Sequence, residues 1–267
     1  MEIKKRVADV AKLWKDRRIP LLASSLSFFL LFIIGPFVAA LLLIVDIFFD
    51  AEIVETELFT NLSSIIGEAG VGAMKALVAS ALKIQTAFVF EMVGVIVLVI
   101  TASMLFSNIE SSLELIIEHK RAKRSMRKLA VQRLLGLLFT FVSAAILIAM
   151  IFVSSLLHGI NKSLLAAGFL GFVFLLLAAM YYNLSDRHFR LKNVWGGAFL
   201  STSLLTIMAF LLSLYLRYFP GVDAYSVAGS LLLLMTWLYF SSLIFLTGAA
   251  YIAVRAKRMR EKDSVKA

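Results

Sequence analysis

The chain has 267 residues, of which 61% are hydrophobic and only 16% are charged, whereas soluble domains are roughly 45–50% apolar and about 25% charged. With a mean hydropathy of +0.93, it has too few polar side chains to cover a water-soluble particle, so we expect lipid to surround much of it. The chain contains no cysteine, which excludes disulfide scaffolds, thiol nucleophiles and cysteine-ligated zinc.

Six stretches reach the length of about 20 apolar residues that a helix needs to cross a bilayer. They are Ile19–Val45, Ala87–Ser107, Leu134–Leu157, Ser163–Tyr182, Val194–Phe219 and Val227–Val254. All are apolar on every face, unlike the alternating strands of a membrane barrel. The sequence therefore predicts an all-α membrane protein. A six-transmembrane-helix bundle over residues 19–254 follows a basic segment (1–18) and precedes a basic tail (255–267).

Lysine and arginine are distributed unevenly between the segments that connect these spans. Of the 27, 23 lie on the side that carries the N-terminus and four on the other. The positive-inside rule then places both termini in the cytoplasm. The net charge of +10 needs no nucleic-acid partner, because basic clusters beside spans attract anionic lipid headgroups. We expect membrane lipids as partners and no nucleic acid.

The first span is expected to be a retained helix rather than a signal peptide, because the apolar run after Arg18 exceeds a 7–15-residue signal core. Gly35 and Pro36 fall in its middle, where proline removes a backbone hydrogen bond and bends the axis. Two interpretations stay open for this pair: a packing kink and a functional hinge.

The one long external segment covers residues 46–86 and carries six acidic residues against two lysines. From Val71 onward it becomes apolar, with a lysine spacing that predicts a helix lying at or dipping into the outer interface. A seventh crossing is the alternative, but it would place the basic tail outside, against the charge bias.

Two ionisable side chains fall within the predicted spans, where charge is costly and function is the default hypothesis. Glu91 lies near the outer end of the second span, either as an interfacial acid or as a cation or proton site. Arg217 lies near the outer end of the fifth span and has three candidate partners: Asp46, Asp223 and Glu91.

A polar stripe runs along the second span and out of the membrane. Its members Ser103, Ser107, Glu110 and Glu114 recur at spacings of four, three and four residues, which keeps them on one helical face. Either this is a solvated helix whose acids pair with nearby bases, or it is the carboxylate-lined mouth of a cytoplasmic cavity.

The last two spans carry further small and hydroxyl residues on single faces, a pattern typical of helix packing in lipid. The sixth span has Ser226, Ser230, Trp237, Ser241 and Gly248 within about 60° of one another, and the fifth has Thr202, Thr206 and Ser213.

Catalytic motifs are absent from the sequence. There is no His-Glu-x-x-His pair, no Gly-x-x-x-x-Gly-Lys phosphate loop and no Gly-x-Ser-x-Gly elbow. Asp186 and His188 could meet Glu110 or Glu114 at the cytoplasmic face, but loops beside membranes routinely carry such residues for solvation. We expect no enzymatic activity, no cofactor and no metal site.

Several short motifs occur in an order and at spacings that resemble those of a known protein family. They are Leu22-Ala23-Ser24-Ser25-Leu26-Ser27-Phe28-Phe29 before Gly35-Pro36, Tyr181-Tyr182-Asn183-Leu184-Ser185-Asp186-Arg187, Trp195-Gly196-Gly197-Ala198-Phe199, Trp237-Leu238-Tyr239-Phe240-Ser241 and Leu246-Thr247-Gly248-Ala249-Ala250. The chain resembles the YihY/BrkB family of bacterial inner-membrane proteins. The resemblance implies six transmembrane helices and two cytoplasmic termini in the bacterial cytoplasmic (inner) membrane, but no substrate. Some relatives carry the label ribonuclease BN.

The chain departs from the family pattern at four positions. Ser185 stands where the family has proline, Ser226 where it has glycine, Ala250 where it has glutamate, and Glu114 at the usual asparagine. The resemblance therefore indicates a divergent member.

These patterns favour a transporter or lipid-handling protein with a cytoplasm-facing polar cavity, its substrate undefined. The expected lining is Glu110, Glu114, Ser103, Ser107, Thr206, Ser230, Trp237 and Ser241. The alternatives are an envelope-organising protein without transport and a ribonuclease-type enzyme. Small residues four apart, such as Ala167 and Gly171, fit either internal packing or a homo-oligomer.

Overall fold

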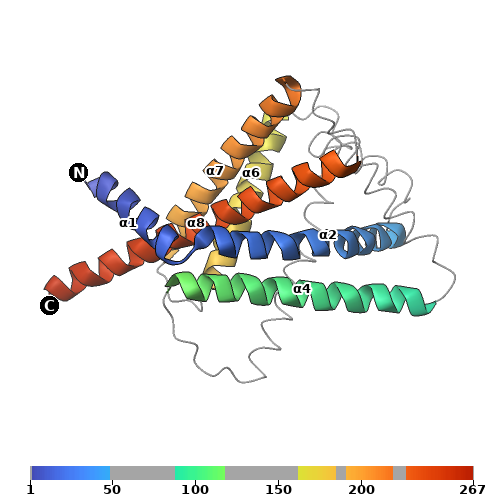
Figure 1. Ribbon diagram of the computed structural model, residues 1–267, viewed down its shortest axis with the longest axis horizontal. Coiled ribbons are helices and arrows are strands. Elements are labelled where there is room, and N and C mark those ends of the chain that lie inside the picture. The colour runs from blue at the N-terminus through green and yellow to red at the C-terminus, as the bar shows by residue number, and fades with distance from the viewer. Residues whose placement is uncertain (1, 49–87, 118–161, 185–190, 219–226, 267) are drawn as a thin grey trace.

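The computed structural model describes residues 2–48, 88–117, 162–184, 191–218 and 227–266, and all of these are helical apart from the turn at Arg17 and Arg18. The helices are α1 (Glu2–Asp16), α2 (Ile19–Phe48), α4 (Phe88–Ile117), α6 (Lys162–Leu184), α7 (Leu191–Tyr218) and α8 (Val227–Lys266), as Figure 1 shows.

Five of the six predicted spans overlap α2, α4, α6, α7 and α8. Among the described residues, Leu191–Tyr215 and Leu232–Met259 are each long and apolar enough to cross a membrane. A third candidate is the bent pair Val7–Asp16 and Ile19–Ile34. The third predicted span (134–157) and the helix expected in the external segment lie outside the described residues, so the count of six crossings stays a prediction.

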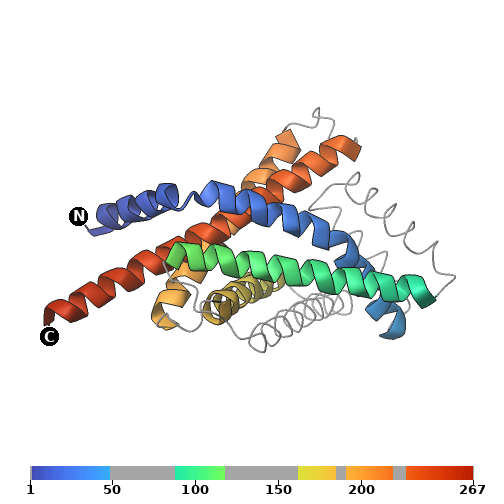
Figure 2. The same cartoon turned by 60° about the horizontal axis from the view of Figure 1, so that its bottom comes forward.

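Helix α8 is at the centre of the assembly, where it packs against α1, α2, α4 and α7. Helices α2 and α4 lie side by side, and α6 packs on α7. In both Figure 1 and Figure 2 the N- and C-termini lie at the same end of the molecule. The side of the membrane on which the termini lie stays a prediction.

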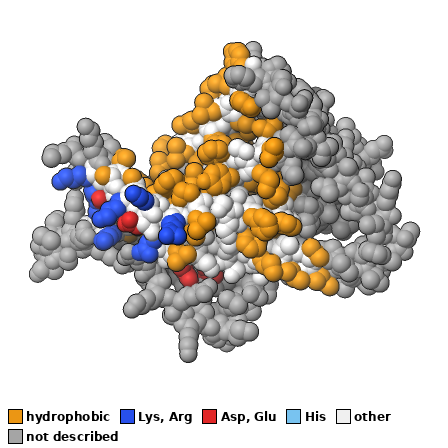
Figure 3. Space-filling view, in the orientation of Figure 1, with side chains coloured by type: hydrophobic (Ala, Val, Ile, Leu, Met, Phe, Trp, Pro, Cys, Tyr) orange, Lys and Arg blue, Asp and Glu red, His pale blue; other side chains and the backbone are white. Residues whose placement is uncertain are grey.

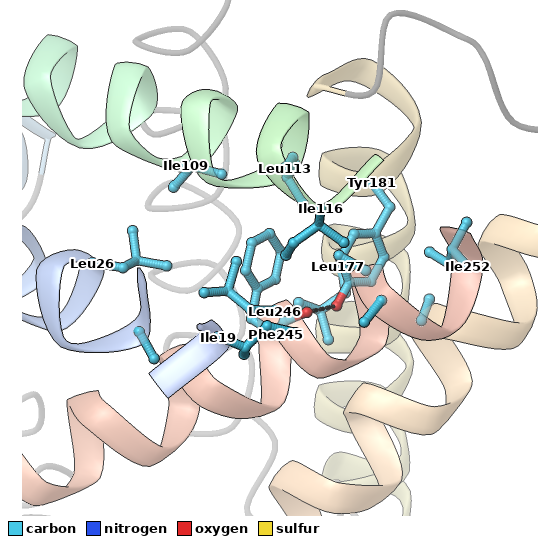
Figure 4. Close-up of a cluster of buried hydrophobic side chains, with 14 of the residues drawn as sticks. Ile19, Leu26, Ile109, Leu113, Ile116, Leu177, Tyr181, Phe245, Leu246 and Ile252 are labelled. Atoms are coloured by element: carbon cyan, nitrogen blue, oxygen red, sulfur yellow. Dashed lines mark hydrogen bonds between the residues drawn. The ribbon is translucent and has the colours of Figure 1, made fainter. Parts of the chain in front are cut away.

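A core of buried side chains joins five of these helices, α2, α4, α6, α7 and α8 (Figure 4). Helix α4 contributes one face whose members recur at three- or four-residue spacing, as a helix packed on one side requires: Ala102, Leu105, Ile109, Leu113 and Ile116. Many large apolar side chains point outward instead, among them Phe28, Phe199 and Phe210, which are 53%, 69% and 63% exposed. Contiguous apolar surface of this kind is unfavourable in water and is covered by lipid in a membrane.

The turn between α1 and α2 was not anticipated from the sequence, which predicted only a basic segment there. Arg18 has a positive φ of 49°, and the axes of residues 7–16 and 19–34 differ by 67°. The N–H of Arg18 bonds the Lys15 carbonyl at 3.1 Å, and the Arg18 carbonyl accepts from Leu21 N–H at 2.9 Å. Pro20 fits the first turn of α2 because no intrahelical donor is needed there.

Helix α1 is amphipathic rather than simply charged. Val10, Leu13 and Trp14 pack against the core, whereas Lys5, Lys12 and Lys15 are exposed. The basic segment is therefore part of the folded assembly.

The Gly35-Pro36 pair lies inside α2, which stays helical on both sides of it. In Figure 2 the second half of α2 bends away from the line of the first half, as a proline within a helix predicts. The bend fits the packing kink and the functional hinge equally, so both interpretations stay open.

Candidate functional site

A buried cluster of hydrogen-bonded side chains joins α6, α7 and α8. The Tyr181 hydroxyl donates to the Phe245 carbonyl over 2.6 Å and lies 2.8 Å from Ser201 Oγ. Because the single phenolic hydrogen is used on Phe245, Ser201 is the donor in the second contact. The Tyr181 ring also stacks on the Phe245 ring, with centroids 4.9 Å apart and planes 10° from parallel. We call Tyr181, Ser201, Phe245 and Gly248 the three-helix knot.

Two glycines allow the backbones of α7 and α8 to approach closely beside this knot. A Cβ on Gly248 would overlap the Ser201 and Tyr181 hydroxyls and lie 3.2 Å from the Gly197 carbonyl oxygen. A Cβ on Gly197 would overlap the Ile252 side chain and lie 3.1 Å from the Gly248 carbonyl oxygen. Close approach at small residues is the usual geometry of helix pairs in lipid.

The knot accounts physically for three of the motifs that carry the family resemblance. Tyr181, Gly197 and Gly248 come from separate motifs, and the structure brings them to one place. Ala250, where the family has glutamate, is fully buried, so this position holds a methyl group inside the core.

A second polar contact joins α2 to α4. Asn108 Nδ2 donates to Ser25 Oγ over 3.0 Å. The other amide atom, Asn108 Oδ1, is enclosed and has no hydrogen-bond partner within the described part of the chain. A buried acceptor left unpaired costs about 1–3 kcal/mol, so Asn108 is kept at a cost to stability.

The predicted stripe on α4 lies beside the core face of that helix. Ser103, Glu110 and Glu114 are half-buried and Ser107 is exposed. Asn108 is on another face of α4, which it shares with the buried Ser112 four residues later. Sequence reasoning missed Asn108 because it placed the end of the span at Ser107, one residue earlier; an amide inside an apolar helix was the available signal.

The predicted residues on α7 and α8 lie in different environments. Thr206 is exposed, and its hydroxyl donates to the Thr202 carbonyl of its own helix over 2.8 Å. Trp237 and Ser241 are half-buried. Ser230, Glu91 and Arg217 fall within helices, but their side chains lie outside the described part of the molecule.

Several other hydroxyls bond the carbonyl four residues earlier in their own helix. Thr101, Thr236, Ser242 and Thr247 do so over 2.7–2.8 Å. A hydroxyl satisfied in this way needs no solute or neighbouring helix. A hydroxyl stripe alone is therefore a weaker indicator of a cavity than an unpaired group such as Asn108.

Basic side chains gather at the end of the molecule that carries both termini, next to a broad apolar surface (Figure 3). Arg258 of α8 binds Asp9 of α1 through both guanidinium Nε, at 2.9 Å, and Nη2. This ion pair connects two helices through residues that are 249 apart in sequence. The separation of charged and apolar surface is that of a protein with one end at a membrane interface.

No group of three or more histidine, aspartate or glutamate side chains with metal-binding proximity occurs within the part of the chain that the structure describes. Asp186 and His188 lie outside that part.

Helices with apolar outer faces, and a cluster of basic side chains at the end that carries both termini, define an all-helical membrane protein in the part of the chain that the structure describes. A family model described as Virulence factor BrkB matches residues 10–267. The chain belongs to the BrkB virulence factor family, which confirms the resemblance seen in its motifs. No curated protein and no solved structure matches it.

Proposed function

We propose that this protein is a multi-pass transporter or lipid-handling protein of the bacterial inner membrane, with both termini in the cytoplasm. Its solute would pass the contact between α2 and α4. The observation that carries the proposal is the enclosed, unpaired amide oxygen of Asn108. The proposal assigns no catalytic role to the chain.

The environment of Asn108 is apolar on the core side of α4. Its neighbours in sequence on that face, Leu105 and Ile109, are 7% and 4% exposed. A polar group at membrane depth costs free energy and is retained where it serves a function. A solute that carries a hydroxyl or ammonium group would supply the missing hydrogen to Asn108 Oδ1.

The acids of the stripe lie nearer the basic end of the molecule than Asn108, but on a different face of α4, because steps of two and six residues turn the helix by about 200° and 240°. Glu110 and Glu114 follow Asn108 by half a turn and by nearly two turns of α4. In Figure 1 and Figure 2 the end of α4 that follows Glu114 is the end nearer the termini. Half-buried carboxylates there would favour a cationic or zwitterionic solute.

A second candidate function is an envelope-organising protein without transport. It is supported by the hydroxyls bonded within their own helices and by the three-helix knot, both of which are explained by packing alone. The two candidates differ in what they require of Asn108.

The test is solute flux through reconstituted vesicles, screened over ions, osmolytes and lipids, with thermal unfolding measured in parallel. Asn108→Leu should abolish flux and raise the unfolding temperature, because it removes a functional group that costs stability. Glu114→Gln should lower the flux of cationic solutes. Met104→Leu is the control, since Met104 is on the same helix and 52% exposed.

Two outcomes would refute transport. One is flux unchanged by Asn108→Leu. The other is no flux of any solute combined with a lower unfolding temperature in Asn108→Leu, since this marks Asn108 as a packing residue and favours the organising function.

A further inference from the structure

Arg255 is the first basic residue after the apolar part of α8, which ends at Val254. Its guanidinium lies against Gly196 of α7: a Cβ on Gly196 would be 2.5 Å from Arg255 Nη1 and 3.5 Å from Tyr251 Cε1. Glycine at 196 therefore makes room for the guanidinium. The side chain is half-buried, in contrast to Lys257, which is exposed.

Arg255 has no hydrogen-bond or ion-pair partner in the described part of the chain, where the carboxylate of Asp9 is taken by Arg258. Gly196 is in the second turn of α7, which begins at Leu191. A guanidinium at this place is therefore uncompensated and favours an anion.

An independent observation marks the same place. Asn193 is 1% exposed, and its amide oxygen has no hydrogen-bond partner among the residues that the structure describes. Asn193 precedes Gly196 and Gly197 by three and four residues, so it lies on the same face of α7 as these glycines. This face packs against α8 near Arg255 and Ile252. A donor from outside the described residues is needed to satisfy this oxygen.

We propose that Arg255, Asn193 and Gly196 form a binding site for an anionic phospholipid whose headgroup carries a hydroxyl. The guanidinium binds the phosphodiester, for which its planar fork is suited. The amide oxygen of Asn193 accepts from the headgroup hydroxyl. The position fits this ligand, because Arg255 directly follows the apolar stretch and lies at headgroup depth.

This site does not depend on the solute path at Asn108. It is separate in sequence and in helices, with α7 and α8 in place of α2 and α4. A structural lipid bound here would stabilise the crossing of α7 and α8 whether or not the protein transports anything.

Native mass spectrometry of the full-length protein in detergent tests the proposal, with phosphatidylglycerol and phosphatidylcholine as probes. We expect selective retention of phosphatidylglycerol. Arg255→Gln should weaken it about tenfold, the equivalent of one charge-assisted hydrogen bond. Arg255→Lys should weaken it less, since it keeps the charge but loses the fork. Lys257→Gln is the matched control, because it removes the same charge two residues away and should change affinity less than about twofold.

Gly196→Ala tests the geometry without changing charge. The new methyl group would displace the end of the flexible Arg255 side chain, so phosphatidylglycerol retention should fall while the protein stays folded. This variant also keeps the test decisive if Arg255→Gln does not fold.

The proposal fails if Arg255→Gln and Lys257→Gln weaken binding equally, since this would indicate diffuse charge. It also fails if Gly196→Ala leaves binding intact. Stabilisation of the protein by inorganic phosphate to the same extent as by phosphatidylglycerol would overturn the assignment to a lipid.

Discussion

At Gly248 the hydroxyls of Ser201 and Tyr181 occupy the space that any side chain would need. We expect Gly248→Ala to destabilise the protein by about 1–3 kcal/mol, the usual cost of overfilling a packed core. Thermal unfolding in detergent measures this. Gly171→Ala is the matched control, because nothing lies within 4 Å of a Cβ on Gly171, and alanine favours the helix there.

The knot also predicts coupling between residues. Ser201→Ala removes one of the two hydroxyls that oppose the new methyl group, so the double variant with Gly248→Ala should lose less stability than the sum of the single variants. Equal unfolding temperatures for Gly248→Ala and Gly171→Ala would show that the three helices do not meet as described.

Sequence reasoning found Tyr181 and Gly248 of the knot as motif members, but it singled out neither Ser201 nor Phe245 and did not predict the contact. Hydropathy shows that α6, α7 and α8 are apolar. It does not show which face of each helix points toward its neighbours, because the helices are apolar on all faces. The pairing of Tyr181 with Ser201 depends on which faces meet, and helices that are apolar all round carry no amphipathic pattern to decide it. Asn108 was missed for a related reason, because a span boundary drawn by composition ended beside it.

The turn between α1 and α2 depends on a residue in the left-handed region. Arg18 pays a steric cost there that glycine does not, of about 1 kcal/mol. We therefore expect Arg18→Gly to unfold at a higher temperature than Arg18→Ala. The two variants lose the same charge and differ only in the Cβ, so their difference isolates the backbone conformation. Equal stabilities would contradict the strained turn.

Helix boundaries were predicted best where a helix begins at the same residue as its apolar stretch. The first residue of α2 and of α8 coincides with the predicted start of its span. In contrast, α4 continues ten residues past Ser107, and α8 continues twelve past Val254. A span predicted from hydropathy ends at the first charged residues. The helix itself continues through them, because Glu, Lys and Arg are good helix formers.

The whole molecule has its described termini at one end, and this gives a labelling prediction. The chain lacks cysteine, so single cysteines report cleanly. Lys5→Cys and Lys257→Cys, both at exposed positions, should react with a membrane-impermeant maleimide only in inside-out vesicles. Asn61→Cys, in the predicted external segment, should react only in intact cells. Labelling of Lys5→Cys and Lys257→Cys from opposite faces would contradict an even number of crossings.

The central place of α8 has a consequence for how the protein is made. Translation produces α1, α2, α4 and α7 before the helix on which all four pack, so each enters the bilayer before its main partner exists. Quality-control proteases would meet these orphaned segments during every round of synthesis. A premature stop codon upstream of Val227 should thus yield inserted but unassembled fragments, which the cell clears quickly.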